Sequence, residues 1–428
     1  MTQATKHARR GRRTVARHGE LRSPSPLAFL MKIVGVVAAV VLVSGLGVAA
    51  YAATDVVQSF TSQAVDLEDQ GTIPPDIGAI EGGVDLLLVG TDECEPDYAY
   101  IFGPRCTGPD AEGQLNDVNM LVHISDNPRR VTVVSFPRDL MVSIPSCTRE
   151  DGSTSEATGK TQINEAWGMG GLSCVAKTIK ELSGENIPFA AKVSFGNVIN
   201  ITGAIGGVDV CIGNGGIKDV YTGIDWPAGP RTISGLEALQ FLRTRHGLTG
   251  GSDLSRISNQ QQYMSSLARK LVSDEVLSNP ATLYKLATTA SENITPSKSL
   301  ANPMTLVQIA LAVKNVPFED IVFVQYPVLE DPADSNRVVP DFDSAAKLWA
   351  ALAANEQLDV TQQSQGVIVE PQTTDPNATV DPNATVDPNA TVDPNATPTD
   401  GTAVLPDNIT GQNAAQQTCS AGNVRAKG

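Results

Sequence analysis

Histidine is scarce in this chain, which has only 4 among 428 residues, and no two cysteines have the C-x-x-C spacing. Only His123 and His246 lie beyond the N-terminal region, which disfavours a zinc site built from histidine and cysteine ligands. The G-x-S-x-G elbow of serine hydrolases is also absent. These absences argue against both zinc-dependent and serine-nucleophile chemistry.

Positive charge is scarce outside the N-terminal segment. Residues 1–32 carry eight basic residues and one acidic residue, whereas the rest of the chain carries 23 basic and 46 acidic residues. Because nucleic-acid binding usually requires a basic surface, we expect no nucleic-acid partner. Hydrophobic residues make up 41% of the chain and charged residues only 18%, so most of it is expected to fold.

Only one long apolar run is present, and it follows the basic segment. Residues 33–54 contain no charge, and such a run crosses about 30 Å of hydrocarbon as a helix. We therefore expect a basic cytoplasmic segment at 1–26 and a transmembrane signal-anchor at 27–54. The positive-inside rule then places the rest of this single-pass protein outside the cell membrane. A cleaved signal peptide is the alternative, because Ala50-Tyr51-Ala52 resembles a cleavage site.

The six cysteines all follow the apolar run, at Cys94, Cys106, Cys147, Cys174, Cys211 and Cys419. In an oxidising compartment an even set of cysteines favours disulfides, although the sequence alone does not determine their pairing. We expect Cys94 to pair with Cys106 across a loop, and Cys147 with Cys174 across a polar insertion. Cys211 follows an apolar stretch and is expected to be a buried free thiol.

Short β-branched runs alternate with helical patterns after residue 82. The expected strands are residues 84–89, 118–124, 131–136 and 321–326, and the expected helices are 166–182, 236–243, 253–272, 303–315 and 345–355. This alternation predicts an α/β sandwich around a largely buried sheet. Residues 55–81 are expected to form a polar, partly helical connector.

Folding signals stop at about residue 357. Residues 348–424 contain no lysine or arginine, and residues 375–397 repeat D-P-N-A-T with a period of six. A β-helix is the alternative interpretation, but this repeat offers at most one valine to an inward position. We therefore expect residues 357–428 to form an acidic, Pro-rich and largely disordered tail, with the DPNATV repeats as an extended spacer.

Charged residues stand beside the expected strands and helices. Asp92 ends the first strand and Asp117 begins the second, where α/β folds hold ligands. Either aspartate alone is also typical of a turn, but two carboxylates brought together can hold Mg²⁺ with phosphate oxygens. Arginines, which bind phosphate in a bidentate manner, follow in the chain at Arg138, Arg243, Arg245 and Arg256, and Gln260 stands four residues after Arg256 on one helix face. This pattern predicts a diphosphate ligand bound with Mg²⁺.

Six blocks follow one another over about 180 residues. They are VDLLLVGTD (84–92), NDVNMLV (116–122), SFPRD (135–139), IGGVDV (205–210), GLEALQFLRTR (235–245) and DLSRISNQQ (253–261). Together they resemble the LytR-CpsA-Psr family of cell-wall glycopolymer transferases, in an actinobacterial-type branch. The basic N-terminus and single apolar run are similar to that family as well.

The resemblance implies an enzyme that transfers a glycopolymer from a polyprenyl-diphosphate carrier to peptidoglycan through a phosphodiester. It also implies an extracellular catalytic domain at 82–356, with a mixed central β-sheet flanked by helices on both faces and an apolar tunnel for the lipid. Asp92 and Asp117 match the family's Mg²⁺-associated acids and would also be catalytic. The residues that match its diphosphate site are Arg138, Arg243 and Arg245, which would also be catalytic, together with Arg256 and Gln260.

The chain departs from the family pattern in two places. Cys94 stands where many members have an arginine, so that contact is missing or comes from another residue such as Arg105. Val118-Asn119 replace a common threonine or serine. Two alternatives stay open, a non-catalytic membrane-anchored binder or regulator of lipid-linked wall precursors and a hydrolase of the diphosphate. Hydrolysis is an alternative because water competes for the same phosphorus atom.

Overall fold

The computed structural model describes residues 58, 60–70, 83–108, 113–272, 280–360, 362, 364–369 and 402–424. These ranges fall within residues 56–428, one of two structural units of the chain. The expected anchor at 27–54 and the repeats at 375–397 lie outside the described residues. Within the described ranges, no helix has the length and apolar character needed to cross a membrane.

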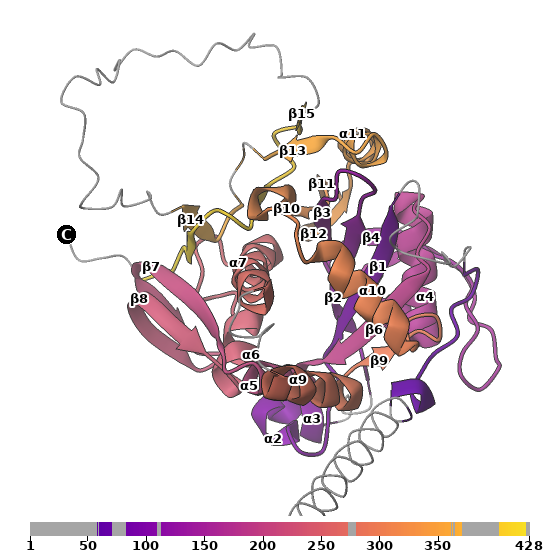
Figure 1. Ribbon diagram of the computed structural model, residues 1–428, viewed down its shortest axis with the longest axis horizontal. Helices are drawn as coiled ribbons and strands as arrows, with labels where there is room; N and C mark the ends of the chain where they lie inside the picture. The colour runs from indigo at the N-terminus through magenta and orange to yellow at the C-terminus, as the bar shows by residue number, and fades with distance from the viewer. Residues whose placement is uncertain are drawn as a thin grey trace, which may run out of the picture. The chain divides into compact units, whose positions relative to one another are not determined.

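A seven-stranded mixed sheet forms the centre of this unit, in the order β16-β10-β3-β2-β1-β6-β9 (Figure 1). Its strands are β1 (Val84–Thr91), β2 (Asn116–Ile124), β3 (Val131–Phe136), β6 (Phe189–Ser194), β9 (Thr295–Pro296), β10 (Ile321–Gln325) and β16 (Gly411–Asn413). Strands β1, β2 and β3 are antiparallel neighbours, whereas β6 runs parallel to β1 and β10 runs parallel to β3. The prediction of a mixed α/β sheet is therefore confirmed.

Helices cover both faces of this sheet because side chains alternate between the faces along each strand. Leu87 and Leu121 point to one face, where they pack with α4 (Ala166–Ser183) and α11 (Phe342–Ala353). Leu86 and Val122 point to the other face, toward α7 (Asp253–Val272) and α10 (Pro303–Val313). The predicted flanking helices are thus present on both sides.

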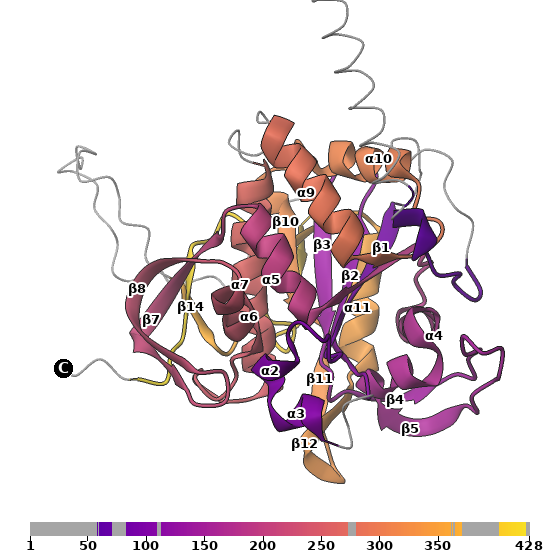
Figure 2. The same cartoon turned by 90° about the horizontal axis from the view of Figure 1, so that it is seen from below.

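A second sheet of four strands packs against α7, in the order β14-β17-β7-β8. Its strands are β7 (Val208–Asp219), β8 (Ile224–Ile233), β14 (Val367–Val369) and β17 (Thr418–Ser420). The β7–β8 pair buries Val210 and Ile217 with Phe241 of α6 (Leu236–Arg243) and Tyr263 of α7. Both views place α7 between the two sheets (Figure 1, Figure 2), so this helix links their cores.

The remaining elements are shorter or lie at the periphery. They are α2 (Ala99–Phe102), α3 (Pro104–Thr107), β4 (Met141–Ile144), β5 (Thr158–Gln162), a 3₁₀ turn at Ile163–Glu165, α5 (Phe195–Ala204), α9 (Pro280–Asn293), a 3₁₀ turn at Phe318–Asp320, β11 (Val328–Asp331), β12 (Asp334–Pro340), β13 (Gln357–Asp359) and β15 (Thr402–Val404). Every strand and helix predicted from the sequence is present, with boundaries displaced by a few residues at most.

The prediction of a disordered tail beginning at residue 357 is wrong for several segments. Strand β16 pairs with β10 at the edge of the central sheet, and β17 lies between β14 and β7 in the second sheet. Gly411 permits the close approach of β16, because a Cβ there would lie 2.1 Å from the carbonyl oxygen of Phe323. The folded unit therefore extends beyond the predicted boundary at 356. Strands of three residues carry no periodic signal, which explains why the sequence did not reveal them.

All six cysteines form disulfides. The predicted Cys94–Cys106 and Cys147–Cys174 pairs are confirmed. The prediction that Cys211 is a free thiol is wrong, because Cys211 bonds to Cys419, which lies 208 residues later. The pairing of β17 with β7 brings these two cysteines together, and their bond ties the C-terminal segment to the second sheet.

Candidate active site

The two aspartates predicted from the strand ends lie at one edge of the central sheet. Because β1 and β2 are antiparallel neighbours, the end of β1 meets the start of β2, and Thr91 pairs with Asn116. The N–H of Leu115 donates to Asp92 Oδ1 at 2.8 Å. Burial raises the pKa of Asp92, the Leu115 hydrogen bond opposes this change, and the negative charge of Asp117 adds to it. The two carboxylates are therefore close enough to interact electrostatically.

Arg138 joins this pair from the turn that follows β3. Its Nη1 lies 2.9 Å from Asp117 Oδ2, and its Nε lies 3.6 Å from Asp253 Oδ1. The strand order places the end of β3 beside the start of β2, which brings Arg138 to Asp117. Burial acts to lower the pKa of Arg138, but the carboxylates of Asp117, Asp253 and Asp139 raise it overall. The guanidinium is therefore held in its charged form.

Asp253 connects two of the predicted arginines, a role that the sequence analysis missed. It is the first residue of α7, and its Oδ1 lies 2.6 Å from Arg256 Nη2. The backbone N–H of Arg138 donates to Asp253 Oδ2 at 3.3 Å, and Arg256 Nη2 donates to the backbone carbonyl of Asp117 at 3.2 Å. An aspartate at a helix N-terminus is favoured by the helix dipole. Here it also holds Arg138 and Arg256 together beside Asp117. We refer to Asp92, Asp117, Asp253, Arg138 and Arg256, together with Arg243 and Arg105, as the charged set.

Arg243 enters the same set from the C-terminal end of α6. The last carbonyls of α6 are held by α7, since Asn259 Nδ2 donates to the Phe241 carbonyl at 2.8 Å and Gln260 Nε2 to the Leu242 carbonyl at 3.0 Å. These bonds satisfy carbonyl groups that a helix end leaves without partners. The side-chain amide of Gln260 thus positions α6, a structural role that its prediction as a ligand contact did not include.

The Arg243 guanidinium forms no hydrogen bond or ion pair with any residue that the structure describes. It lies 4.8 Å from the ring centroid of Phe102 and 5.9 Å from that of Phe195. Burial lowers the pKa of Arg243, and four charged residues modify this shift, namely Asp117, Arg256, Asp92 and Arg138. Arg243 therefore lies within electrostatic reach of the other charged side chains while lacking a carboxylate partner of its own.

Arg245 lies apart from these residues. Its backbone N–H donates to Asp219 Oδ2 at 3.1 Å, and its Nη2 lies 3.0 Å from Nε2 of His246. The ring of His246 packs against Tyr221 with 4.7 Å between the centroids. In the described part of the chain, no contact joins Arg245 to Asp92 or Asp117, and none joins it to the other three predicted arginines. The structure thus brings together three of the four predicted arginines.

Arg105 adds a charge to the set, in agreement with the expectation that it could replace the arginine missing at Cys94. Its Nη2 lies 3.2 Å from Asp92 Oδ2. Arg105 belongs to the short helix α3, and the Cys94–Cys106 disulfide ties that helix to the segment that follows Asp92. Arg105 therefore stands beside the first aspartate, although it comes from a different part of the chain than the family pattern predicts.

The residues at this edge fit the predicted Mg²⁺. Asp117 Oδ1 is buried and has no hydrogen-bond partner among the described residues, and Asp92 lies nearby. Within the described ranges, no three or more histidine, cysteine, aspartate or glutamate side chains are arranged so that they could hold a metal ion by themselves. Mg²⁺ does not need such a group, because it commonly binds one or two carboxylates together with water and phosphate oxygens.

Comparison with known proteins agrees with the sequence motifs. The LytR-CpsA-Psr family model matches residues 50–354. The cell wall biosynthesis protein LcpA of Corynebacterium glutamicum is 29% identical over 317 residues, which are 68% of this chain and 58% of LcpA. The polyisoprenyl-teichoic acid–peptidoglycan teichoic acid transferase TagV of Bacillus subtilis is 25% identical over 254 residues, which are 58% of this chain and 62% of TagV. This chain thus spans less than two thirds of the length of either relative.

The fold agrees with a solved structure as well. The LytR-Csp2A-Psr enzyme from Actinomyces oris matches with a TM-score of 0.50 and 20% identity, over 68% of this chain and 96% of that structure. The family match covers most of the chain, and two of the matching proteins come from Corynebacterium glutamicum. The chain therefore belongs to the LytR-CpsA-Psr family, as an actinobacterial-type member.

Proposed function

We propose that this protein transfers a glycopolymer from a polyprenyl-diphosphate carrier to peptidoglycan and joins them through a phosphodiester. The observation that carries the proposal is the half-buried guanidinium of Arg243, which faces the charged set without a carboxylate partner among the described residues. An arginine in this situation favours an anionic ligand, and several arginines together neutralise a diphosphate. The name of TagV describes a transferase from a polyisoprenyl-linked polymer to peptidoglycan, which supports the same activity here.

In the proposed reaction, an acceptor hydroxyl attacks the phosphorus atom that carries the glycopolymer. A new P–O bond forms, the bond between the two phosphates breaks, and polyprenyl phosphate leaves. Arg138, Arg243 and Arg256 bind the diphosphate and neutralise charge that develops on its oxygens, the main requirement for phosphoryl transfer. The proton of the hydroxyl passes to water, because Asp92 and Asp117 would hold the metal ion.

We include Mg²⁺ in this proposal. Asp117, through its unpartnered Oδ1, and Asp92 would hold the ion. When bound, Mg²⁺ supplies positive charge that polarises phosphoryl oxygens. The arginines alone do not complete the binding site, because two aspartates placed beside a diphosphate would otherwise repel it.

We place the polyprenyl chain on the face of the sheet that α7 and α10 cover. Leu86, Leu88, Val118 and Val122 are only partly buried there. On the opposite face of the same strands, Leu87 and Leu121 are completely buried. Partly buried apolar side chains on central strands suit contact with an apolar ligand, and these strands lead directly to Asp92 and Asp117.

We further propose that residues 27–54 anchor the protein in the cell membrane, with residues 1–26 in the cytoplasm and the folded unit outside. The basic charge of the N-terminal segment supports this orientation. The three disulfides support an oxidising compartment for the folded unit. Protease added to intact spheroplasts should digest the folded unit, and protection of that unit would contradict the proposed topology.

The activity is tested by incubating the full chain with a labelled polyprenyl-diphosphate donor and soluble peptidoglycan fragments. We expect a product linked by a phosphodiester, which EDTA abolishes and excess Mg²⁺ restores. Asp92→Asn should raise the Mg²⁺ concentration that half-maximal transfer requires, with circular dichroism as the control for folding. Binding of the donor without turnover would favour the non-catalytic alternative. Release of the polymer phosphate without a linked product would favour a diphosphate hydrolase.

A further inference from the structure

We propose that a groove along the first turns of α4 binds the acceptor as a neutral, N-acetylated oligosaccharide. Its role as the acceptor site rests on the proposed function, but the binding of sugar does not. The groove consists of two cavities of about 1140 Å³ and about 460 Å³, which share Gly168 in their lining. We refer to them together as the α4 groove. The smaller volume lies within the usual range of ligand sites and the larger lies slightly above it, so together they exceed the space that a single sugar ring needs.

Residues that line the α4 groove are bonded to residues of the charged set or adjoin them in the chain. Leu115 lines the smaller cavity, and its N–H donates to Asp92 Oδ1 at 2.8 Å. Gln162 lines the same cavity, and its Nε2 donates to Oδ1 of Asp139, the neighbour of Arg138, at 3.0 Å. The larger cavity is lined by Glu93, which follows Asp92 in the chain. An oligosaccharide in the groove would thus extend along α4 while one of its hydroxyl groups approaches the diphosphate site.

Glycines explain why a groove exists at this place. Gly168, Gly170 and Gly171 leave one side of the first turns of α4 without side chains. Gly170 and Gly171 depart from helical geometry and kink the helix, and Gly171 has a φ of 61°, which glycine adopts at low cost. A Cβ at Gly170 would lie only 2.7 Å from the Cβ of Cys147. Gly170, which lines the larger cavity, therefore packs directly against the Cys147–Cys174 disulfide.

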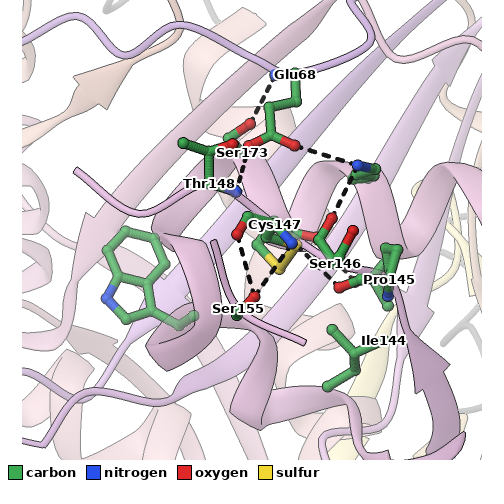
Figure 3. Close-up of a disulfide and its surroundings, with 12 residues drawn as sticks. Glu68, Ile144, Pro145, Ser146, Cys147, Thr148, Ser155 and Ser173 are labelled. Atoms are coloured by element: carbon green, nitrogen blue, oxygen red, sulfur yellow. Dashed lines mark hydrogen bonds and ion pairs between the residues drawn. A yellow bond between two sulfur atoms is a disulfide. The ribbon is translucent and has the colours of Figure 1, made fainter. Parts of the chain in front are cut away.

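The larger cavity is also lined by Glu68, whose carboxylate is held near this disulfide (Figure 3). The N–H of Thr148 donates to Glu68 Oε1 at 2.5 Å, and the N–H of Glu68 donates to Oγ of Ser173 at 2.7 Å. Although burial acts to raise it, the pKa of Glu68 is lowered overall by the hydrogen bonds from Thr148 and by Lys177. A rigid, ionised carboxylate is a suitable acceptor for sugar hydroxyl groups.

Trp167 supplies an aromatic surface within the groove. Its Nε1 donates to Gln114 Oε1 at 2.7 Å, which fixes the plane of the indole. Lys192 Nζ lies 5.7 Å from the ring centroid and 2.7 Å from Glu93 Oε1. A large apolar ring surrounded by amide, ammonium and carboxylate groups suits a sugar, which presents C–H groups on its faces and hydroxyl groups at its edge.

Asn164 offers a polar contact that the protein leaves unused. It lines the smaller cavity, it is only 6% exposed, and its Oδ1 has no hydrogen-bond partner in the described part of the chain. A buried amide oxygen without a partner is costly. The N–H of an N-acetyl group or a sugar hydroxyl would provide the missing donor.

The charge of the groove favours a neutral ligand over an anionic one. Five acidic and two basic residues line the larger cavity. A phosphate-bearing polymer would be repelled there, whereas the neighbouring arginines attract it. The distribution of charge therefore assigns the anionic donor to Arg138, Arg243 and Arg256 and a neutral glycan to the α4 groove.

The test titrates the full chain with the tetrasaccharide of N-acetylglucosamine and follows binding by calorimetry. Gly168→Leu places a side chain in both cavities, at an exposed helical position whose Cβ has no described atom within 4 Å. We expect this variant to bind at least about tenfold more weakly than the wild type. The matched control is Gly203→Leu, at an exposed helical glycine of α5 with equally open surroundings, and it should bind as the wild type does.

Two further measurements sharpen this test. Trp167→Ala should lose binding, whereas Trp167→Phe should retain most of it because an aromatic ring remains for stacking. A hyaluronan tetrasaccharide, which has the same length but carries carboxylates, should bind more weakly than the neutral probe. Absence of binding by the wild type, or equal binding by wild type and Gly168→Leu, would overturn the proposal. Intact tetrasaccharide binding in a protein that never turns over a lipid-linked donor would overturn the proposed function and leave the groove standing as a glycan site.

Discussion

Strands β1 and β2 carry charged residues at both of their ends, and the two ends differ in how these charges are paired. At one end, Asp85 and His123 are direct cross-strand neighbours, and Asp85 Oδ1 lies 2.9 Å from His123 Nδ1 with both side chains buried. At the other end, Asp92 and Asp117 meet arginines from α3, the turn after β3, α6 and α7. The first end holds one buried Asp–His pair, whereas the second end holds the charged set.

The difference distinguishes a structural ion pair from a ligand site. In the Asp85–His123 pair, each side chain has the other as its hydrogen-bond partner. In the charged set, Arg243 lacks an ion-pair partner and Asp117 Oδ1 lacks a hydrogen-bond partner among the described residues. Incompletely paired buried charges destabilise a fold, and they persist where a function requires them. The same two strands thus serve stability at one end and chemistry at the other.

We call the end of β1 and β2 that carries Asp92 and Asp117 the open end. The largest effect is expected from removing an arginine there. Arg138→Ala and Arg243→Ala should each lower the rate of transfer by about 10²–10³, or roughly 3–4 kcal/mol, because transition-state charge loses its partner in a partly buried site. Replacement by lysine should recover little, since an ammonium group cannot reproduce the bidentate geometry. The measurement is transfer of the labelled donor to peptidoglycan fragments.

The control for this experiment is Arg231→Ala. Arg231 pairs with Glu237 at 2.6 Å and lies 4.5 Å from the ring centroid of Trp226, away from the charged set. Its removal should leave the turnover unchanged. Folded Arg138 and Arg243 variants with wild-type turnover would contradict the diphosphate site.

We call the end of β1 and β2 where Asp85 pairs with His123 the closed end. The opposite outcome is expected there, namely a loss of stability without a loss of turnover. His123→Leu leaves the carboxylate of Asp85 buried without its partner, which should lower the free energy of unfolding by about 3 kcal/mol. Turnover per folded molecule should stay at the wild-type value. Urea denaturation measures the change, and Asp85→Asn combined with His123→Leu should regain part of the stability. A loss of turnover without a loss of stability would show that this pair also serves the reaction.

A smaller effect is expected from Asp253, which positions arginines without facing the ligand itself. Asp253→Asn weakens its bonds to Arg138 and Arg256, and by analogy with residues that orient metal ligands it should lower transfer by about 10–100-fold. The donor concentration at half-saturation should rise while the melting temperature changes little. Asp253→Glu, which keeps the charge, should recover part of the activity. Unchanged kinetics in Asp253→Asn would show that the arginines hold their positions without it.

The smallest effect concerns the pH dependence of stability at the closed end. Burial acts to lower the pKa of His123, but Asp85, with a contribution from Glu185, raises it overall above 6.5. A histidine whose pKa is higher in the folded state contributes its full stabilisation below the unfolded-state pKa and loses it as the pH rises through the folded-state pKa. Unfolding free energies should therefore decline as the pH rises above neutrality. The double variant Asp85→Asn/His123→Gln should show a flatter profile, and an identical slope would contradict the assignment.

Much of the open end could be predicted from the sequence, because its residues stand next to strong local signals. Asp92 and Asp117 flank two apolar β-branched runs, and antiparallel pairing of those runs brings their ends together. Arg138 stands two residues after Phe136, the last residue of the third run. Asp253 was missed as a site residue because an acid at a helix start already has a local explanation. Arg245 and Gln260 show the limit of such reasoning, since proximity in the chain does not determine which way a side chain points.

The central strands and helices, two of the three disulfides, the family, and the aspartates and three arginines that meet at one edge of the sheet were all predicted correctly from the amino-acid sequence. These features depend on local periodicity or on short loops, which a single chain segment records. The Cys211–Cys419 bond, the strands within 402–424, the role of Asp253 and the α4 groove became evident only from the folded structure. Each of these depends on segments far apart in the chain, and the free energy that brings such segments together comes from packing that leaves no local pattern.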